Sequence, residues 1–113
     1  METTQNFVIP ARESDKNALV LRLERTEKDL TQLRITLNSY RCEPRTYSLF
    51  ERIESLKTGM DRLSKTNREM ISALREHKKT VGDYVELAKQ QFLEFQRLQN
   101  GVEDYLSYCL NSY

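Results

Sequence analysis

The 113-residue sequence has no tryptophan, one histidine, two cysteines, two prolines and three glycines. So few glycines and prolines argue against an all-β fold, whose many tight turns need them. The longest uninterrupted apolar run is Ala18 to Leu21, far short of the roughly 20 residues that span a bilayer. The first twenty residues contain acids and no long apolar stretch, so we expect no secretory signal. The length suits one domain, and these absences predict a soluble, helix-rich one.

The scarcity of reactive side chains narrows the possible functions. A Ser-His-Asp or Cys-His catalytic set would have to use His77, and no acid is placed to orient it. Cys42 and Cys109 are far apart and lie in no metal-binding spacing, so we expect free thiols in a reducing compartment. Isolated glycines form no phosphate-binding loop. We therefore predict a protein that is not an enzyme, with no catalytic residues, cofactor, metal or small-molecule substrate.

Neither sign of charge is in excess, because 18 Lys and Arg face 17 Asp and Glu. No nucleic-acid partner is expected, since phosphate binding usually requires a clear basic excess. The basic run at 75–79 suits the negative end of a helix dipole. Its alternative role is binding to a membrane surface through Arg75, Lys78 and Lys79, so membrane contact is at most peripheral. We expect a cytoplasmic location, with a nuclear one also open.

What the sequence does contain is a long heptad pattern, with apolar residues three and four positions apart. We predict a flexible segment over 1–13 and a helical domain over 14–113, with helices at about 14–41, 46–78 and 81–112. Ser14 is a good N-cap, and Glu24 and Lys28 are spaced as an ion pair within the first helix. The predicted seam residues are Leu19, Leu23, Thr26, Leu30, Leu33, Leu37 and Tyr40, then Leu49, Ile53, Leu56, Met60, Leu63, Asn67, Met70, Leu74 and His77, then Val81, Tyr84, Ala88, Gln91, Phe95, Leu98, Val102, Tyr105 and Cys109.

Two folds fit this pattern. Thr80 and Asp83 form a variant capping box, which favours a turn before the third helix. Folding the chain back near Lys79 places Asn67 opposite Gln91, where the two amides could satisfy each other. We predict an all-α, antiparallel up-down-up three-helix bundle with heptad packing. The alternative is a short first helix folded back on one continuous helix over 46–111, in a dimeric coiled coil.

The third helix is apolar outside its seam as well, which indicates two neighbours, or one neighbour and an external partner. In the bundle, Tyr40 and Tyr47 would lie at the same end as Tyr105, Tyr108 and Tyr113. This end is either a capping core or an aromatic binding surface. The candidate residues of a partner interface are Phe92, Leu93, Tyr105, Leu106, Tyr108 and Leu110.

The length and heptad pattern resemble those of helical domains in SNAREs, in vesicle-tether and lysosome-biogenesis subunits, and in kinetochore or spindle subunits, although no motif carries the likeness. A spectrin-type repeat has a similar length but usually carries a tryptophan. We predict a helical protein–protein interaction domain, a subunit or adaptor of a cytosolic multi-protein assembly of the trafficking/tether or cytoskeletal/kinetochore type. Its partners would be other helical proteins or itself. The alternatives are a self-assembling structural coiled-coil dimer and a peripheral membrane-surface binder.

Overall fold

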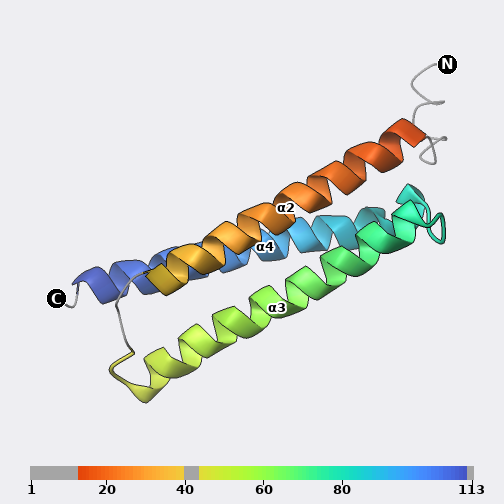
Figure 1. The fold of residues 1–113 in the computed structure, drawn as a ribbon. Helices are drawn as coiled ribbons and strands as arrows, with labels where there is room; N and C mark the ends of the chain where they lie inside the picture. Colours follow the sequence, from red (N-terminus) through yellow and green to blue (C-terminus); the bar gives the residue numbers. More distant parts are fainter. Residues whose placement is uncertain (1–12, 40–43, 112–113) are drawn as a thin grey trace.

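The computed structural model describes residues 13–39 and 44–111, without the side chains of 13, 14 and 109–111. The described residues form three helices and no strand: α2 (Glu13–Ser39), α3 (Tyr47–Arg75) and α4 (Val81–Asn111). Their directions alternate along the chain (Figure 1), so the predicted up-down-up bundle is confirmed and a continuous helix over 46–111 is not formed. The predicted flexible segment lies outside the described residues, except that Glu13 already belongs to α2.

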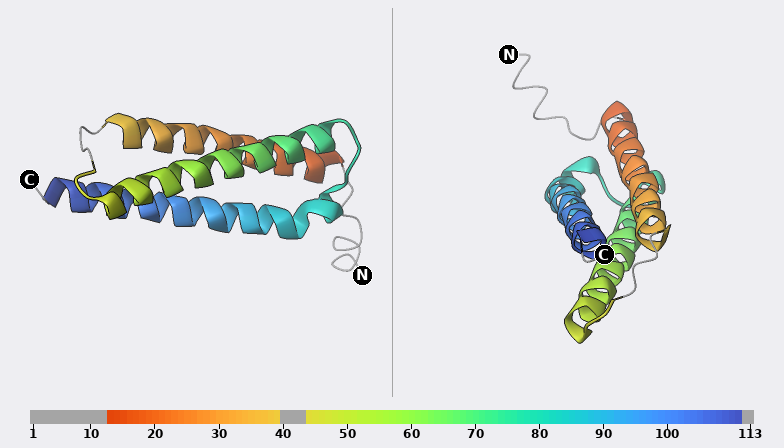
Figure 2. Two further views of the ribbon diagram at one scale, coloured as in Figure 1. Left: turned by 90° about the horizontal axis from the view of Figure 1, so that it is seen from below. Right: turned by 90° about the vertical axis from the view of Figure 1, so that its left-hand side faces the viewer.

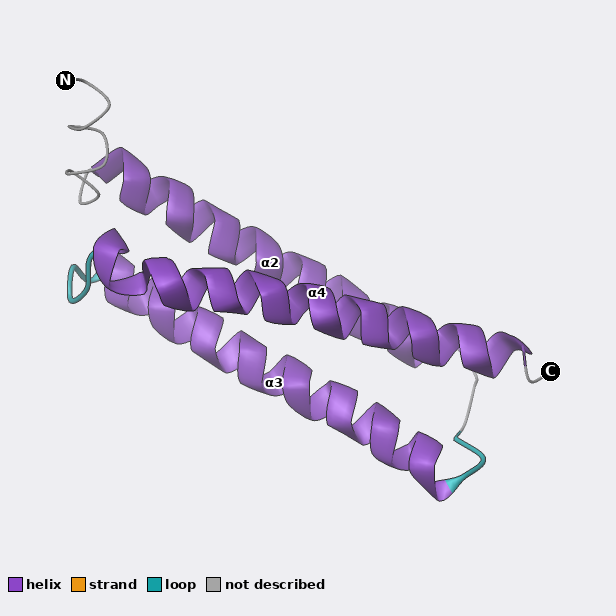
Figure 3. Cartoon of the chain, turned by 180° about the vertical axis from the view of Figure 1, so that it is seen from behind, coloured by secondary structure: helices purple, strands orange, loops and turns teal. Residues whose placement is uncertain are grey.

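Each helix packs against the other two in an elongated molecule of 60 × 28 × 19 Å. The long axes of the helices run side by side, and the view along them shows α2, α3 and α4 at the three corners of a bundle (Figure 2). Seen from behind, α4 lies in front of the other two helices (Figure 3). The broad apolar surface predicted for the third helix is therefore explained in part by its two neighbours within the chain.

The first turn of α3 is capped as its sequence suggests. Thr46 is the N-cap, and its hydroxyl oxygen accepts a hydrogen bond of 3.1 Å from the amide of Leu49. This hydroxyl satisfies one of the amides that a helix start leaves without an intrahelical partner.

The other end of α3 lies at Arg75, three residues before the predicted end at 78. His77 has a φ of 60°, the left-handed conformation that stops a helix. The amide of His77 donates to the carbonyl of Leu74 at 3.2 Å, and the amide of Lys78 donates to that of Ala73 at 2.9 Å. These two bonds form a Schellman motif, which usually has glycine where this chain has His77.

The capping box before α4 is confirmed. The amide of Thr80 donates to the Asp83 carboxylate at 2.9 Å, and the amide of Asp83 donates to the Thr80 hydroxyl at 3.3 Å. Hydrogen bonds from the backbone and the hydroxyl of Thr80 lower the pKa of Asp83. The turn at 76–80 is therefore defined from both sides by local interactions.

The core follows the predicted seams closely. Two groups of buried apolar residues fill it, one toward each end of the bundle. Every buried residue of α3 is a predicted seam residue, namely Leu56, Met60, Leu63, Asn67, Met70 and Leu74. Val20 and Leu106 are buried although they lie outside the seams, and His77 is exposed because the helix ends before it.

Two glycines allow α3 and α4 to approach each other. A Cβ on Gly59 would lie 2.8 Å from Cδ2 of Leu98, and a Cβ on Gly101 would lie 2.7 Å from Cδ2 of Leu56. Each glycine thus makes room for a leucine of the opposite helix, where a larger residue would overlap it.

Candidate protein interface

A chain of polar side chains crosses the centre of the bundle. The Gln91 side-chain amide donates to Asn67 Oδ1 at 2.8 Å and to the Leu63 carbonyl at 3.1 Å. Asn67 is fully buried and donates in turn to Glu27 Oε2 at 3.2 Å. The predicted pairing of Asn67 with Gln91 is confirmed, and the contact with Glu27 extends it to all three helices. We call Glu27, Asn67 and Gln91 the polar layer.

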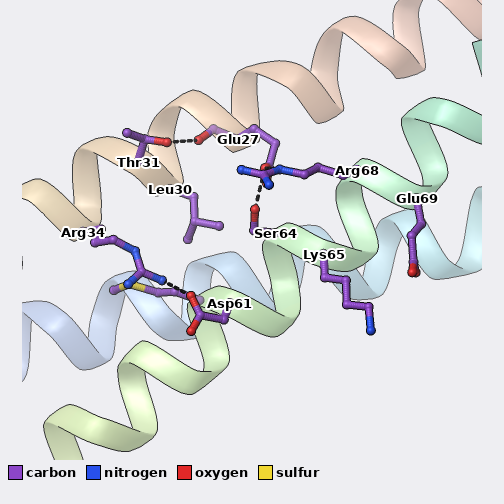
Figure 4. Close-up of a pocket in the computed structure, with 10 residues that line it drawn as sticks. Glu27, Leu30, Thr31, Arg34, Asp61, Ser64, Lys65, Arg68 and Glu69 are labelled. Atoms are coloured by element: carbon purple, nitrogen blue, oxygen red, sulfur yellow. Dashed lines mark hydrogen bonds and ion pairs between the residues drawn. The ribbon is translucent and has the colours of Figure 1, made fainter.

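The groove between α2 and α3 is polar, with a volume of about 500 Å³. Within it Glu27 accepts hydrogen bonds from Ser64 at 2.7 Å and from Arg68 at 3.3 Å (Figure 4). Arg34 and Asp61 form an ion pair across the same groove. The carboxylates and guanidinium groups named here therefore already have partners within the chain.

The groove between α3 and α4 is also largely polar, and it has a volume of about 590 Å³. Arg52 of α3 approaches Asp104 of α4 to 3.8 Å near one end of it. Gly59 and Gly101 lie on its floor with the leucines that fill the space beside them. Arg97, which also lines this groove, pairs with Glu94 of its own helix at 3.3 Å.

The groove between α2 and α4 differs from the other two. At the end where α4 begins, it has a hollow of about 450 Å³ with six apolar residues and two cations in its lining. The guanidinium of Arg22 lies 4.1 Å from the centroid of the Phe92 ring, a cation–π contact between the two helices. This basic end is lined by Leu19, Arg22, Val81, Val85, Ala88, Lys89, Phe92 and Leu93.

A second hollow, of about 510 Å³, continues the groove toward the other end of α4. On α4 one lining residue follows another in steps of three and four across both hollows, at positions 81, 85, 88, 92, 95, 99, 102 and 106. On α2, Arg22 of the first hollow and Asp29 of the second are seven positions apart, so the two hollows lie on one face. Among the described residues, none of the charged side chains that line this groove forms an ion pair across it. This acidic end is lined by Asp29, Gln32, Leu33, Thr36, Phe95, Gln99, Val102, Glu103 and Leu106.

The structure divides the predicted interface residues into two groups. Phe92 is partly buried and Leu93 is 64% exposed, and both line the basic end. Tyr108 is 59% exposed and lies farther along α4. Tyr105 and Leu106, by contrast, are buried in the core at 2% and 9% exposure. Both pack in the core with leucines of the other two helices, and Leu106 also lines the acidic end of the α2/α4 groove.

Leu110, the remaining predicted interface residue, lies outside the described side chains, as do Tyr40 and Tyr113. Of the other tyrosines expected at this end, Tyr47 is 75% exposed.

Sequence reasoning missed the α2 side of this groove, in particular Leu19 and Arg22 as surface residues beside Phe92. A pattern that could have found it is a second stripe on α2, in steps of three and four, which shares Leu19, Thr26 and Leu33 with the predicted seam. Its members are Leu19, Arg22, Thr26, Asp29, Leu33 and Thr36.

The basic run at 75–79 is held by contacts within the protein. Arg75 forms an ion pair with Glu24 of α2, whereas the sequence spacing predicted Lys28 as the partner of Glu24. Lys78 pairs with Glu76 at 3.0 Å, and hydrogen bonding from Ser72, then the contact with Lys78, lowers the pKa of Glu76. Nδ1 of His77 lies 2.9 Å from Nζ of Lys16.

In the described part of the chain, no three His, Cys, Asp or Glu side chains are grouped as metal ligands would be. None of the described helices is long and apolar enough to cross a membrane. Comparison of the chain with protein-family models, with curated proteins and with solved structures finds no match.

Proposed function

We propose that this protein is a helical protein–protein interaction domain whose binding face is the α2/α4 groove. It would act as a non-enzymatic subunit or adaptor of a cytosolic multi-protein assembly, of the trafficking/tether or cytoskeletal/kinetochore type. The observation that carries the proposal is the contrast between the grooves. Ion pairs of the chain bridge the other two, whereas the α2/α4 groove has no such bridge among the described residues and leaves Leu93 accessible.

A groove between two parallel helices can accommodate another helix, because the side-chain ridges of that helix pack between the side chains of the two. From Val81 to Leu106 the α4 side of the groove spans about 25 residues, which corresponds to roughly 38 Å of helix. A partner helix of that length could cover the apolar residues along the whole groove. Covering Leu93, which is 64% exposed, would contribute up to about 1.5–3 kcal/mol of gross burial, and each partly buried side chain would contribute less.

The peripheral-membrane alternative has less support. Two of its three cations, Arg75 and Lys78, already contact carboxylates of this chain. An ion pair of this kind must be given up or shared before the cation can bind a lipid headgroup.

The proposal is tested by proximity labelling in cells with the wild type, Leu93→Asp and Leu21→Asp. Leu21 and Leu93 are both 64% exposed, but Leu21 does not line the groove. We expect the proteins labelled by the wild type to be kept by Leu21→Asp and lost by Leu93→Asp, while circular dichroism shows three equally folded proteins. Equal labelling by all three, or equal loss in both variants, would contradict the assignment of the binding face.

A further inference from the structure

The charges that line the α2/α4 groove are separated by sign. The basic end carries Arg22 from α2 and Lys89 from α4, and no acid lines it. The acidic end carries Asp29 from α2 and Glu103 from α4, and no base lines it. Such a surface is complementary to itself when a second copy is laid on it in the opposite direction.

We propose that the occupant of the groove is a second copy of this chain, related by a twofold axis that runs across the two helices. The proposal rests on the proposed function of the groove as a binding face, and it names the partner. In the resulting dimer α2 packs against the α2 of the second copy, and α4 packs against its α4, both antiparallel. The basic end of each copy then meets the acidic end of the other.

The positions of the charges agree on where this axis passes. On α2, the midpoint between Arg22 and Asp29 falls between residues 25 and 26. On α4, the midpoint between Lys89 and Glu103 is residue 96. These midpoints lie at the same height in the bundle, because α2 and α4 run in parallel and Arg22 contacts Phe92, which lies 70 residues later. A single twofold axis therefore brings opposite charges together on both helices. Charges placed without regard to a dimer would not need to share a midpoint height.

The apolar residues fit the same arrangement. Leu19 lines the basic end and Leu33 the acidic end of the groove. Their midpoint on α2 is residue 26, next to the axis that the charges define, so the same axis brings Leu19 of one copy opposite Leu33 of the other. An unrelated partner would have to supply both an acidic and a basic end at this spacing, whereas a second copy supplies them already.

The test uses charge reversal at Lys89 and Glu103 in the full chain, with analytical ultracentrifugation over a concentration series. In a twofold dimer each reversal replaces two attractions by two repulsions. Lys89→Glu alone and Glu103→Lys alone should each raise the dimer dissociation constant by roughly tenfold or more. In an equal mixture of the two variants, both interchain pairs are again between opposite charges. The mixture should therefore form heterodimers with a dissociation constant within about threefold of the wild-type value.

Two controls accompany the experiment. Lys89 also contacts Glu86 of its own helix at 3.5 Å, so circular dichroism must show that each variant keeps its helix content. Lys28→Glu changes an exposed charge of α2 that does not line the groove, and it should leave the dissociation constant within about threefold of the wild-type value.

A wild-type protein that remains a monomer at about 0.5 mM would overturn the proposal. So would a dimer whose two charge-reversed variants fail to restore each other in the mixture. Failure of this inference is distinct from failure of the proposed function. A monomer that loses its labelled partners in Leu93→Asp, but keeps them in Leu21→Asp, would still use the groove as a binding face.

Discussion

Asn67 and Gln91 are amides in an otherwise apolar core, and each is held by specific hydrogen bonds. Because a buried polar group without a partner costs about 1–3 kcal/mol, the two residues stabilise the bundle only as a pair in the correct register. A slip of α4 along α3 by one heptad would separate them. At the scale of single residues, the polar layer therefore specifies how the helices align.

A double-mutant cycle tests this coupling. Asn67→Leu should lower the free energy of unfolding by about 1–3 kcal/mol, because Gln91 and Glu27 each lose a partner. Asn67→Leu/Gln91→Leu should cost less than the sum of the two single changes, measured by urea denaturation. Strict additivity of the two single effects would show that the amides do not act together.

His77 occupies the left-handed position that ends α3, where a side chain is strained and glycine is not. His77→Gly should therefore raise the free energy of unfolding by about 0.5–1 kcal/mol, even though it removes the contact with Lys16. The comparison variant is His77→Ala, which also removes the imidazole but keeps the strain of a Cβ. If both variants changed stability equally in thermal denaturation, backbone strain would not be the cause.

The helix ends show how much short-range chemistry defines an element. Thr80 and Asp83 satisfy each other's amides before α4 begins, and the α3 Schellman motif closes the turn from the other side. Asp83 in its charged form accepts these bonds, which is why its pKa is lowered in the folded protein. Stability therefore depends on pH through this residue.

The sign of that dependence follows from the lowered pKa. The contribution of Asp83 is fully present above the pKa of an unfolded aspartate, about 3.9, and is lost as the pH falls through the lower folded value. The melting temperature of the wild type should thus fall further between about pH 7 and pH 3 than that of Asp83→Asn. Equal decreases in the two proteins, measured by circular dichroism, would remove the charged cap as a source of acid sensitivity.

The contact between α3 and α4 gives a second test at this scale. Alanine favours a helix interior over glycine by about 1 kcal/mol, and exposed Gly82, in the first turn of α4, should show part of this gain on change to Ala. Gly101→Ala should not, because its Cβ would lie 2.7 Å from Cδ2 of Leu56 and force that side chain to move. We expect Gly101→Ala to be about 1 kcal/mol less stable than Gly82→Ala in urea denaturation. An equal gain in both would mean that α3 and α4 do not need this glycine.

For the whole molecule, the up-down-up order places the end of α2 and the start of α3 at the same end as the end of α4 (Figure 1). Cys42 follows Ser39 of α2 by three residues, and Cys109 falls in the last turn of α4. Cys42 lies outside the described residues, but its place three residues after α2 predicts that the two cysteines, 67 positions apart in the sequence, share one end of the bundle.

A short thiol-to-thiol cross-linker should accordingly join Cys42 to Cys109 within one chain, as identified by digestion and mass spectrometry of dilute protein. A disulfide requires the two Cα atoms to lie within roughly 7 Å, and a cross-linker tolerates somewhat more. The proposed antiparallel dimer keeps the cysteine ends of the two copies apart, so it adds no interchain product. A covalent dimer as the main product would contradict this arrangement of the chain.

The sequence by itself determined the three helices and their inner faces. Caps such as Thr46 and Thr80 bond to residues three positions away, so helix starts can be predicted from neighbouring residues. Heptad spacing likewise indicates which side of a helix is buried. The contact between Asn67 and Gln91 could also be predicted, because the position of the turn between two antiparallel helices fixes which of their residues lie opposite each other. The end of α3 was predicted three residues too late, and Ser14 was predicted as an N-cap although α2 already includes Glu13.

Only the tertiary structure decided how the outer faces are used. Leu93 and Leu106 are both leucines outside the seam of α4, yet one is exposed and the other is in the core. Likewise Glu24 pairs with Arg75, 51 residues away, and not within its own helix. The physical reason is that helical periodicity is local, whereas the rotation and spacing of helices result from the packing of all three together. The apolar α2/α4 groove is a product of that packing, since its two sides come from opposite ends of the sequence.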